Sequence, residues 1–468
     1  MMSAAQVAVE RMRSVDHAWL RMDEPANLMM INGLLFFDDP LDLTEVRRAL
    51  AERFVTIPRF SQRVVETGKQ QKSSWQTDPD FDLDAHVVEE VLPSPGDDAA
   101  LQDLVSSWMS TPLDRSRPLW MCHLIQNYQG GSALLWRLHH CLGDGLVLML
   151  VLLSTTELSA PEESGSRQET ESTNPLRSLF SDNPPDKKVA SGYIQDLMPA
   201  AVRLLTGPAE KLASLSGWVK SGVFVPTFGR MAVRPPDPAT AFKGTLGVRK
   251  RAAWSAPVSL EDVGRVREAI GGTLNDVLTN AVAGGLRRYL VGRGEVKKEL
   301  SFRAIVPVSL RPLEEMAQLG NQFGLVFLSL PVGIEDPRER LAKLQRRMGR
   351  LKHSFEPVVV MQVLGALGVS PKAIQKLVIR IFGTKGTAVL TNVPGPRRTL
   401  FFTGKAMRDF VFWVPQSGRL GMGIAISSYA GNVRVGIVTD AGLVADPETI
   451  IAGFHEEFSA MLQLAEGS

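Results

Sequence analysis

The chain has 468 residues, of which 44% are hydrophobic and 22% charged, and its formal net charge is +2. This composition is typical of a globular protein and excludes both a disordered chain and one that binds nucleic acid through bulk positive charge. The length predicts two domains of roughly 150 to 200 residues each, because a single hydrophobic core rarely grows beyond about 250 to 300 residues.

The first third of the chain alternates short helical and strand-like segments. Residues 41–54, LDLTEVRRALAERF, carry apolar residues at helical spacing and predict an amphipathic helix. Residues 132–138, SALLWRL, predict a buried strand, and the apolar residues 145–158 predict a core helix. Between them lies HHCLGDG, residues 139–145, so two adjacent histidines are expected where a strand passes into a helix.

A change of composition divides the chain in two. Residues 159–188 are rich in Ser, Glu, Pro and Asn and lack apolar periodicity, which predicts a linker. Residues 189–232 are amphipathic but interrupted by prolines, which predicts a helical crossover that packs on the protein or, alternatively, touches lipid. The predicted domains are therefore residues 1–158 and 245–468, with the linker and crossover, residues 159–244, between them.

The second predicted domain also mixes helices and strands. Its last helix is expected to have Asp446 as N-cap and Pro447 in the first helical position. Helices are further predicted for residues 259–270 and 273–290, a strand for residues 301–311, and a pair of strands joined by a tight turn for residues 421–440.

The sequence predicts a cytoplasmic location. Charges at Glu10, Arg11 and Arg13 interrupt the apolar region that a signal peptide needs, and no apolar run approaches the roughly 18 residues of a membrane span. Two cysteines, Cys122 and Cys141, cannot form a disulfide framework, and no CxxC pair predicts zinc. Peripheral contact with a membrane or a lipid droplet stays open, because Met, Phe and Trp are plentiful enough for an apolar surface.

The histidine pair allows three interpretations. Metal binding is disfavoured, because neighbouring side chains at a strand end point to opposite faces and no HxxxH or CxxC adds ligands to His139 and His140. Both rings could instead be hydrogen-bonded core groups. The glycines Gly143 and Gly145 on either side of Asp144 indicate close approach of a ligand or another chain segment, which favours a functional loop.

A functional histidine in this loop would act as a general base. A neutral imidazole with an ordinary pKa of about 6.5 is suited to take a proton from a hydroxyl. The chain has no GxSxG elbow and no recognisable cysteine-nucleophile signature, so the reacting hydroxyl is expected to belong to a substrate.

Further motifs, one upstream of HHCLGDG and four downstream, occur in an order that is informative as a set. They are PLDRSRPLW (112–120), TLNDV (273–277), VPVSLR (306–311), GNQFG (320–324) and TNVPGP (391–396). Together with the N-terminal DHAWLRMDEPANLMMINGLLFF and the HHxxxDG pattern, they resemble the bacterial and plant wax ester synthase/diacylglycerol acyltransferase family. That family is a branch of the acyl-CoA-dependent acyltransferases that resemble chloramphenicol acetyltransferase and peptide-synthetase condensation domains.

The resemblance implies an α/β fold of two chloramphenicol acetyltransferase-like sandwich domains with an active-site tunnel between them. It implies that His140 is the catalytic base and that His139 is its supporting neighbour. Asp144, the third member of the expected catalytic set, would pair with an arginine away from the substrate. Gly145 would leave room for the acyl donor.

The other motif residues have both structural and functional interpretations. Asn275 and Asp276 fit an ordinary helix start, whereas the resemblance makes both candidates for substrate binding and Asn275 a candidate donor to the reacting carbonyl. The residues expected to give structural support are Trp120, Arg311, Asn392 and Pro394.

The implied activity is transfer of a long acyl chain from acyl-CoA to a fatty alcohol, giving a wax ester, or to diacylglycerol, giving triacylglycerol. Acyl-CoA would be a co-substrate, and neither a metal nor a bound cofactor is expected. Nucleic acid is not an expected partner. Two alternatives stay open: an acyltransferase with a carrier-protein donor or a polyketide or glycolipid acceptor, and a lipid-binding or lipid-droplet protein without catalysis.

Overall fold

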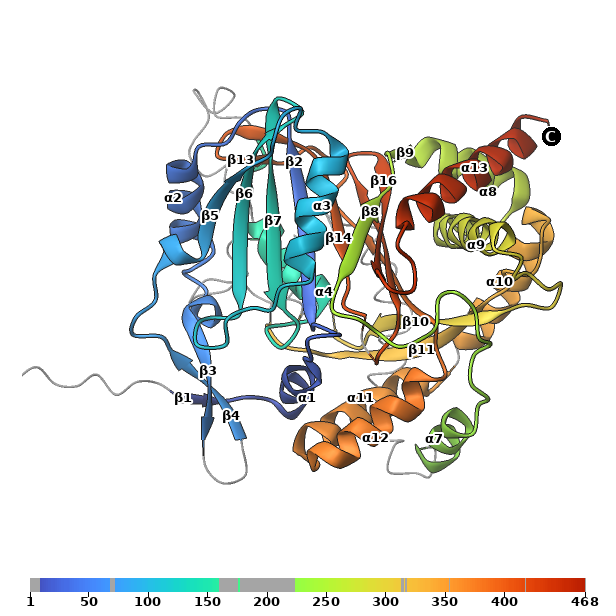
Figure 1. Cartoon of the computed structure of the whole chain (residues 1–468), viewed down its shortest axis with the longest axis horizontal. Coiled ribbons are helices and arrows are strands. Elements are labelled where there is room, and N and C mark those ends of the chain that lie inside the picture. The colour runs from blue at the N-terminus through green and yellow to red at the C-terminus, as the bar shows by residue number, and fades with distance from the viewer. Residues whose placement is uncertain are drawn as a thin grey trace, which may run out of the picture.

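Two mixed sheets form the centre of the protein, and helices cover them on the outside (Figure 1). The predicted linker and most of the predicted crossover lie outside the described residues, so only α7 (Phe224–Ala232) represents the crossover. The computed structural model describes residues 9–67, 72–159, 176, 224–312, 315, 318–352, 354–416 and 418–467.

The first sheet contains the predicted strand before the histidines. This strand, β7, is buried at all nine of its residues, because both faces of the sheet are covered. Its prediction over residues 132–138 is confirmed. In spatial order the strands are β13 (Phe401–Phe402), β14 (Lys405–Trp413), β2 (Met30–Phe37), β7 (Gly131–His139), β6 (Trp120–Tyr128) and β5 (Val87–Val91).

The second sheet is built from the C-terminal half of the chain. The predicted strand pair over residues 421–440 is confirmed as β15 and β16, whose turn contains Ala430 and Gly431 at positive φ. In spatial order the strands are β11 (Phe323–Leu330), β10 (Phe302–Ser309), β12 (Ala388–Pro394), β15 (Met422–Tyr429), β16 (Asn432–Asp440) and β8 (Lys250–Trp254), and β9 (Val258–Ser259) also pairs with β16.

The two halves of the chain share strands. β13 and β14 come from the C-terminal half, yet β14 pairs antiparallel with β2 and extends the first sheet. The sheets therefore do not follow the division into residues 1–158 and 245–468 that composition suggested. The physical reason is that composition detects a linker, whereas the edge of β2 needs a hydrogen-bonding partner from any part of the chain.

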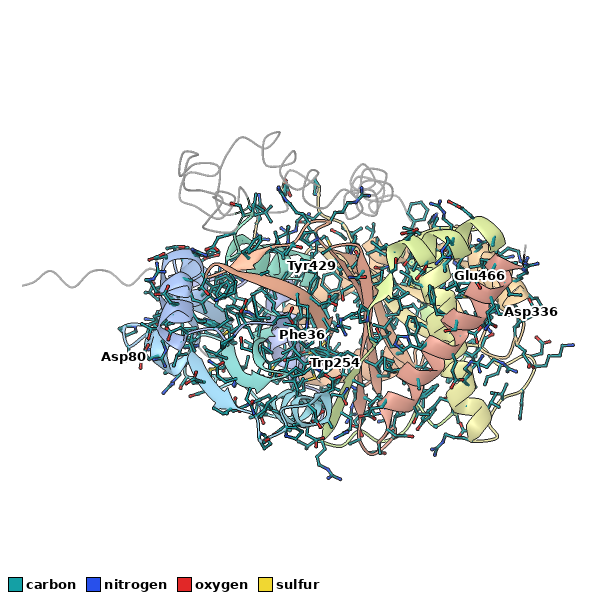
Figure 2. The ribbon with its side chains drawn as sticks, turned by 90° about the horizontal axis from the view of Figure 1, so that it is seen from above. Phe36, Asp80, Trp254, Asp336, Tyr429 and Glu466 are labelled. Atoms are coloured by element: carbon teal, nitrogen blue, oxygen red, sulfur yellow. The ribbon has the colours of Figure 1, made fainter. Side chains whose placement is uncertain are left out.

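Aromatic packing joins the halves where the sheets meet. Phe36 of β2 and Trp254 of β8 lie at the centre of the view in Figure 2, with ring centroids 6.1 Å apart. Trp413 of β14 packs edge-on against Trp254 at 5.7 Å. One continuous apolar cluster thus contains residues of both sheets.

The predicted helices over residues 41–54, 145–158, 259–270 and 273–290 are confirmed as α2, α4, α8 and α9. None of the described helices is long and apolar enough to cross a membrane. The helices are α1 (Ser14–Met22), α2 (Leu43–Arg53), α3 (Asp98–Met109), α4 (Gly145–Ser154), α8 (Leu260–Ile270), α9 (Leu274–Gly292), α10 (Pro337–Leu351), α11 (Glu356–Val369), α12 (Lys372–Gly383) and α13 (Pro447–Glu466). A small third sheet contains β1 (Val9–Arg11), β4 (Lys72–Thr77) and β3 (Gln62–Thr67), and the short 3-10 helices are η1 (Pro58–Ser61) and η2 (Leu83–Ala85).

The start of α13 differs in one respect from the prediction. Pro447 is the first helical residue, as expected, but the Asp446 side chain accepts no hydrogen bond from a backbone N–H of the helix. Its carboxylate instead accepts hydrogen bonds from the Tyr289 hydroxyl at 2.9 Å and from Thr449 Oγ1 at 3.1 Å. A tertiary partner, which the local sequence cannot reveal, has replaced the predicted cap.

Candidate active site

The loop between β7 and α4 presents its two histidines in opposite directions. β7 ends at His139 and α4 begins at Gly145. The His140 N–H donates to Met29 O at 2.8 Å, so the loop continues along the end of β2. Side chains alternate at a strand end, and of the two rings it is that of His140 that lines a cavity between the two sheets.

Helix α1 covers the His140 ring. Trp19 stacks on it with ring centroids 4.2 Å apart and an interplanar angle of 10°. Phe323 of β11 lies 5.5 Å from the same ring. Burial lowers the pKa of His140 to about 4, because a charged imidazolium loses its hydration in this apolar setting. The imidazole is therefore neutral at physiological pH and has a lone pair available to accept a proton.

His139 is held by hydrogen bonding on the other side of the strand. Its Nδ1 accepts from the Cys141 N–H at 3.1 Å, and its Nε2 lies 3.8 Å from Asp23 Oδ1. Burial raises the pKa of Asp23, but interactions with His139, Met29 N and Arg115 outweigh it and bring the pKa to about 2. An ionised Asp23 thus lies beside His139 Nε2, beyond hydrogen-bond distance.

Asp144 joins the loop to the second half of the protein. Its Oδ1 accepts from the Val147 N–H at 3.1 Å, which caps α4. Its Oδ2 lies 3.3 Å from Arg311 Nη2 and also accepts from Gln322 N at 3.3 Å. Arg311 is the arginine partner that was expected for Asp144, and its side chain is fully buried.

A second contact brings the same two loops together through the backbone. Gly143 and Gly320 form an isolated parallel bridge, and Gly320 has a φ of +105° that favours glycine. The next residue, Asn321, donates through Nδ2 to His140 O and to Asp16 Oδ1, each at 2.8 Å. Because Asp16 belongs to α1, three distant segments of the chain fix the position of His140.

The cavity at His140 is mainly apolar, and we call it the central cavity. Its polar lining side chains are His140, Asp144, Ser309, Thr391 and Asn392. Two further cavities adjoin it. The α4 cavity lies among β2, β7, α4 and β14 and shares Ile31, Gly145 and Phe412 with the central cavity. The α12 cavity lies among α1, α7, α11 and α12 and shares Trp19 and Leu325 with it.

Of the three predicted substrate-binding residues, one lines the central cavity and two do not. Gly145 lines both the central cavity and the α4 cavity. Asn275 is not among the lining residues, but its Oδ1 accepts from Asn392 Nδ2 at 2.7 Å, and Asn392 lines the central cavity. Asp276 forms a capping box with Thr273 at the start of α9, so its carboxylate is engaged locally and does not line the cavity.

Of the four residues expected to give structural support, two are buried away from the central cavity and two line it. Trp120 is buried in the first sheet, where its Nε1 donates to Phe60 O at 2.7 Å. Arg311 Nη1 donates to Gln318 O at 2.6 Å and Nη2 to Gly320 O at 2.7 Å, which shapes the loop facing Asp144. Asn392 and Pro394 belong to β12 and line the central cavity.

Four contributors to the site were not singled out from the sequence. Trp19 and Asp16 lie in the N-terminal DHAWLRMDEP segment, and Asn321 and Phe323 lie in GNQFG. Both segments were noted as family-like, and that was the only signal that could have found them. Trp19, Phe323 and Asn321 contact His140, and Asp16 accepts a hydrogen bond from Asn321. Each of these contacts spans more than a hundred residues of sequence, which no local pattern encodes.

Two family profiles match this chain. The wax ester synthase/diacylglycerol acyltransferase catalytic domain matches residues 12–278, which is more than half of the chain. The chain belongs to this family. The WS/DGAT C-terminal domain of the same family matches residues 319–462. The predicted family and its acyltransferase class are thereby confirmed.

Individual relatives agree with membership of the wax ester synthase/diacylglycerol acyltransferase family. A Mycobacterium tuberculosis protein named "Probable diacyglycerol O-acyltransferase tgs1" is 29% identical over 449 residues, covering 94% of this chain and 92% of the relative. The solved wax ester synthase/diacylglycerol acyltransferase from Marinobacter aquaeolei VT8 has a TM-score of 0.68 at 22% identity and covers 98% of this chain and 100% of that one.

A more distant structure extends the fold comparison. The first condensation domain of the calcium-dependent antibiotic synthetase has a TM-score of 0.58 at 15% identity, covering 98% of this chain and 96% of that one. At this identity the likeness concerns the fold alone. The expected fold of two chloramphenicol acetyltransferase-like α/β domains is confirmed.

Replacing His140 tests its assignment as the base. We expect His140→Ala to lower kcat by about 10² to 10⁴, the usual contribution of a general base, while the protein remains folded. His139→Ala should lose less activity, because His139 acts by holding the loop. Turnover and thermal melting of both purified variants provide the measurement, and near wild-type activity in His140→Ala would rule out its role as base.

Replacing Asp144 tests the connection between the halves. We expect Asp144→Ala to lower stability by about 3 to 5 kcal/mol, because it leaves the buried Arg311 guanidinium without its carboxylate. Activity should fall with stability. The matched control is Asp42→Ala, which removes a similar cap from α2 but no buried partner. Chemical denaturation of the two variants measures the difference, and equal losses would contradict the role of the ion pair.

The low pKa of His140 predicts an unusual pH profile. We expect kcat/KM for the acceptor to be level near neutrality and to fall only as the pH approaches about 4, well below the ordinary 6.5. Between pH 6.5 and about 4, His140 is protonated in the unfolded chain but not in the folded protein. The free energy of unfolding should therefore also decrease as the pH falls from 6.5 towards 4. Trp19→Ala should admit water to the ring and raise the pH at which kcat/KM begins to fall. If kcat/KM of the wild type falls near pH 6.5 instead, the prediction is refuted.

Proposed function

We propose that the protein transfers a long acyl chain from acyl-CoA to the hydroxyl of a fatty alcohol or of diacylglycerol. The observation that carries this proposal is the position of His140 on the central cavity, which adjoins one apolar cavity at α4 and another at α12. A base with an apolar arm on either side suits two long chains that must meet at one reacting centre.

In the proposed reaction, His140 accepts the hydroxyl proton while the alcohol oxygen attacks the thioester carbonyl. The resulting oxyanion needs hydrogen-bond donors. Gly145 and Leu146 line the central cavity, and N–H groups in the first turn of a helix have no acceptor within that helix. We assign them as the oxyanion donors. The C–S bond then breaks, and coenzyme A leaves as a thiol after taking the proton from the imidazolium.

Direct transfer is favoured over an acyl-enzyme. Cys141, next to the base, is the nearest rival nucleophile, but burial raises the pKa of its thiol well above the ordinary value. A neutral thiol is a weak nucleophile. We therefore propose that acyl-CoA and the acceptor are bound together before transfer.

The proposed substrates are poorly soluble in water, which favours a protein that works at the surface of a membrane or lipid droplet. The crossover segment, residues 189–232, was one candidate for this contact. Of its apolar side chains, Phe228 lies 5.8 Å from Phe382 and lines the α12 cavity, where it is partly buried, whereas Val225 is 74% exposed.

Product analysis tests the substrate assignment. Purified protein should form wax ester from palmitoyl-CoA with hexadecanol, triacylglycerol from palmitoyl-CoA with diacylglycerol, or both, and His140→Ala should form neither. The two reactions are run side by side with an acyl-carrier protein as an alternative donor. Transfer only from the carrier would favour the carrier-dependent alternative, and lipid binding without turnover would favour the non-catalytic one.

Kinetics test direct transfer. We expect intersecting double-reciprocal plots when acyl-CoA and alcohol are varied, because both must be bound before reaction. Radiolabelled acyl-CoA without acceptor should leave no label on the denatured protein, and Cys141→Ala should retain most activity. Parallel plots together with a stable label that Cys141→Ala lacks would establish an acyl-enzyme instead.

A further inference from the structure

Helix α12 exposes an apolar stripe at one end of the molecule, beside α7 and α11 (Figure 1). Ile374, Leu377 and Ile381 have exposed fractions of 50%, 57% and 39%. Their spacing places them on adjoining positions of one helix face. The helix is anchored by its opposite face, where Gln375 Nε2 donates to Ala18 O at 3.0 Å. A stripe of this kind indicates a surface that meets an apolar partner.

A basic stripe runs beside the apolar one. Lys372, Lys376 and Arg380 recur every four residues and are exposed, and α12 contains no acidic residue. Two surface clefts next to the helix extend the positive charge, with seven basic side chains against two acidic ones. The basic residues lining these clefts are Arg11, Arg13, Arg21, Lys372, Lys376, Arg380 and Arg419, and the acidic ones are Glu24 and Glu66.

The inner face of α12 leads towards the base. Val378, Ile379 and Phe382 line the α12 cavity from this helix. At its far end the cavity shares Trp19 with the central cavity, and Trp19 stacks on His140. One layer of side chains therefore separates an apolar space under the exposed helix from the proposed general base.

We propose that α12 lies flat on an anionic lipid surface and that the lipid acceptor passes from this surface through the α12 cavity to His140. The route rests on the proposed function, whereas the docking does not. Three exposed apolar side chains flanked by basic ones are the pattern of a helix that lies in a membrane interface. Anionic headgroups complement the lysines and arginine, and the bilayer accommodates Ile374, Leu377 and Ile381.

Other binding partners would complement only one of the two stripes on α12. The phosphates of coenzyme A would neutralise the basic stripe but would leave the apolar stripe in water. A second copy of the chain, docked by a twofold axis through α12, would bring the two basic stripes close together, which costs free energy through like-charge repulsion. An anionic lipid surface is the partner that matches both stripes.

Vesicle flotation tests the docking. The full-length protein is mixed with phosphatidylcholine vesicles with or without one third phosphatidylglycerol. We expect binding to the anionic vesicles that weakens at high salt. The variants Ile374→Asn/Leu377→Asn/Ile381→Asn and Lys372→Gln/Lys376→Gln/Arg380→Gln should each lower the bound fraction about tenfold. A control variant, Val291→Asn/Lys297→Gln/Lys298→Gln, changes exposed residues remote from α12 and should bind as wild type.

Comparing a vesicle-borne acceptor with a soluble one tests the proposed route of the acceptor through the α12 cavity. With the acceptor in anionic vesicles, both α12 variants should lose about tenfold in rate, whereas with a short-chain alcohol in solution they should stay within about twofold of wild type. A rise in KM for acyl-CoA with the soluble alcohol would assign the basic stripe to coenzyme A and overturn the proposal. Absence of transfer by the wild type would refute the proposed function, yet flotation would still report on docking.

Two further results would also overturn the docking. One is a wild-type dimer that becomes a monomer in the α12 variants, measured by light scattering, because α12 would then be a subunit interface. The other is vesicle binding of the variants equal to that of wild type, with their melting temperatures lowered. That result would mean that another segment of the chain covers the stripe.

Discussion

The buried ion pair between Arg311 and Asp144 is the constraint on which the rest of the site depends. A buried guanidinium is costly unless it is paired. The terminal nitrogens Nη1 and Nη2 of Arg311 donate to Asp144 Oδ2 and to the carbonyls of Glu315, Gln318 and Gly320, whereas its Nε has no hydrogen-bond partner among the described residues. The same carboxylate caps α4. Movement of either half would leave a charge unpaired, so the two loops that carry the pair keep a fixed distance, and the cavity between the sheets keeps its shape.

Helix α1 then completes the environment of the base. Trp19 covers the ring of His140, Asp16 holds Asn321 against the His140 carbonyl, and Asp23 at the end of the helix lies beside His139. This burial also makes the imidazole a weaker base, because it lowers the pKa of His140. The gain is a dry reaction centre. Water in the site would compete with the acceptor hydroxyl for the thioester, and the apolar lining limits its access.

The two apolar cavities offer space for the two proposed lipid substrates, the acyl chain and the acceptor, beside one imidazole. The α4 cavity is enclosed by α4 and by the first sheet, whereas the α12 cavity is lined by a helix that has exposed apolar and basic stripes. This asymmetry fits one arm for the acyl chain and one for an acceptor delivered from a lipid surface. Trp19 and Leu325, shared by the α12 and central cavities, stand between that arm and the base.

The sequence by itself determined the local elements and the chemistry of the loop. Apolar runs and turn residues specify β7, α4 and the antiparallel pair β15 and β16, because these depend on neighbours along the chain. The HHxxxDG pattern singled out His140 and Asp144 as candidate site residues. Only the tertiary structure decided that β14 joins the first sheet, that Asn392 donates a hydrogen bond to Asn275, and that Trp19 covers the His140 ring. Each of these follows from burial or from a hydrogen bond between distant segments, and the free energy of such contacts leaves no periodic trace in the residues that make them.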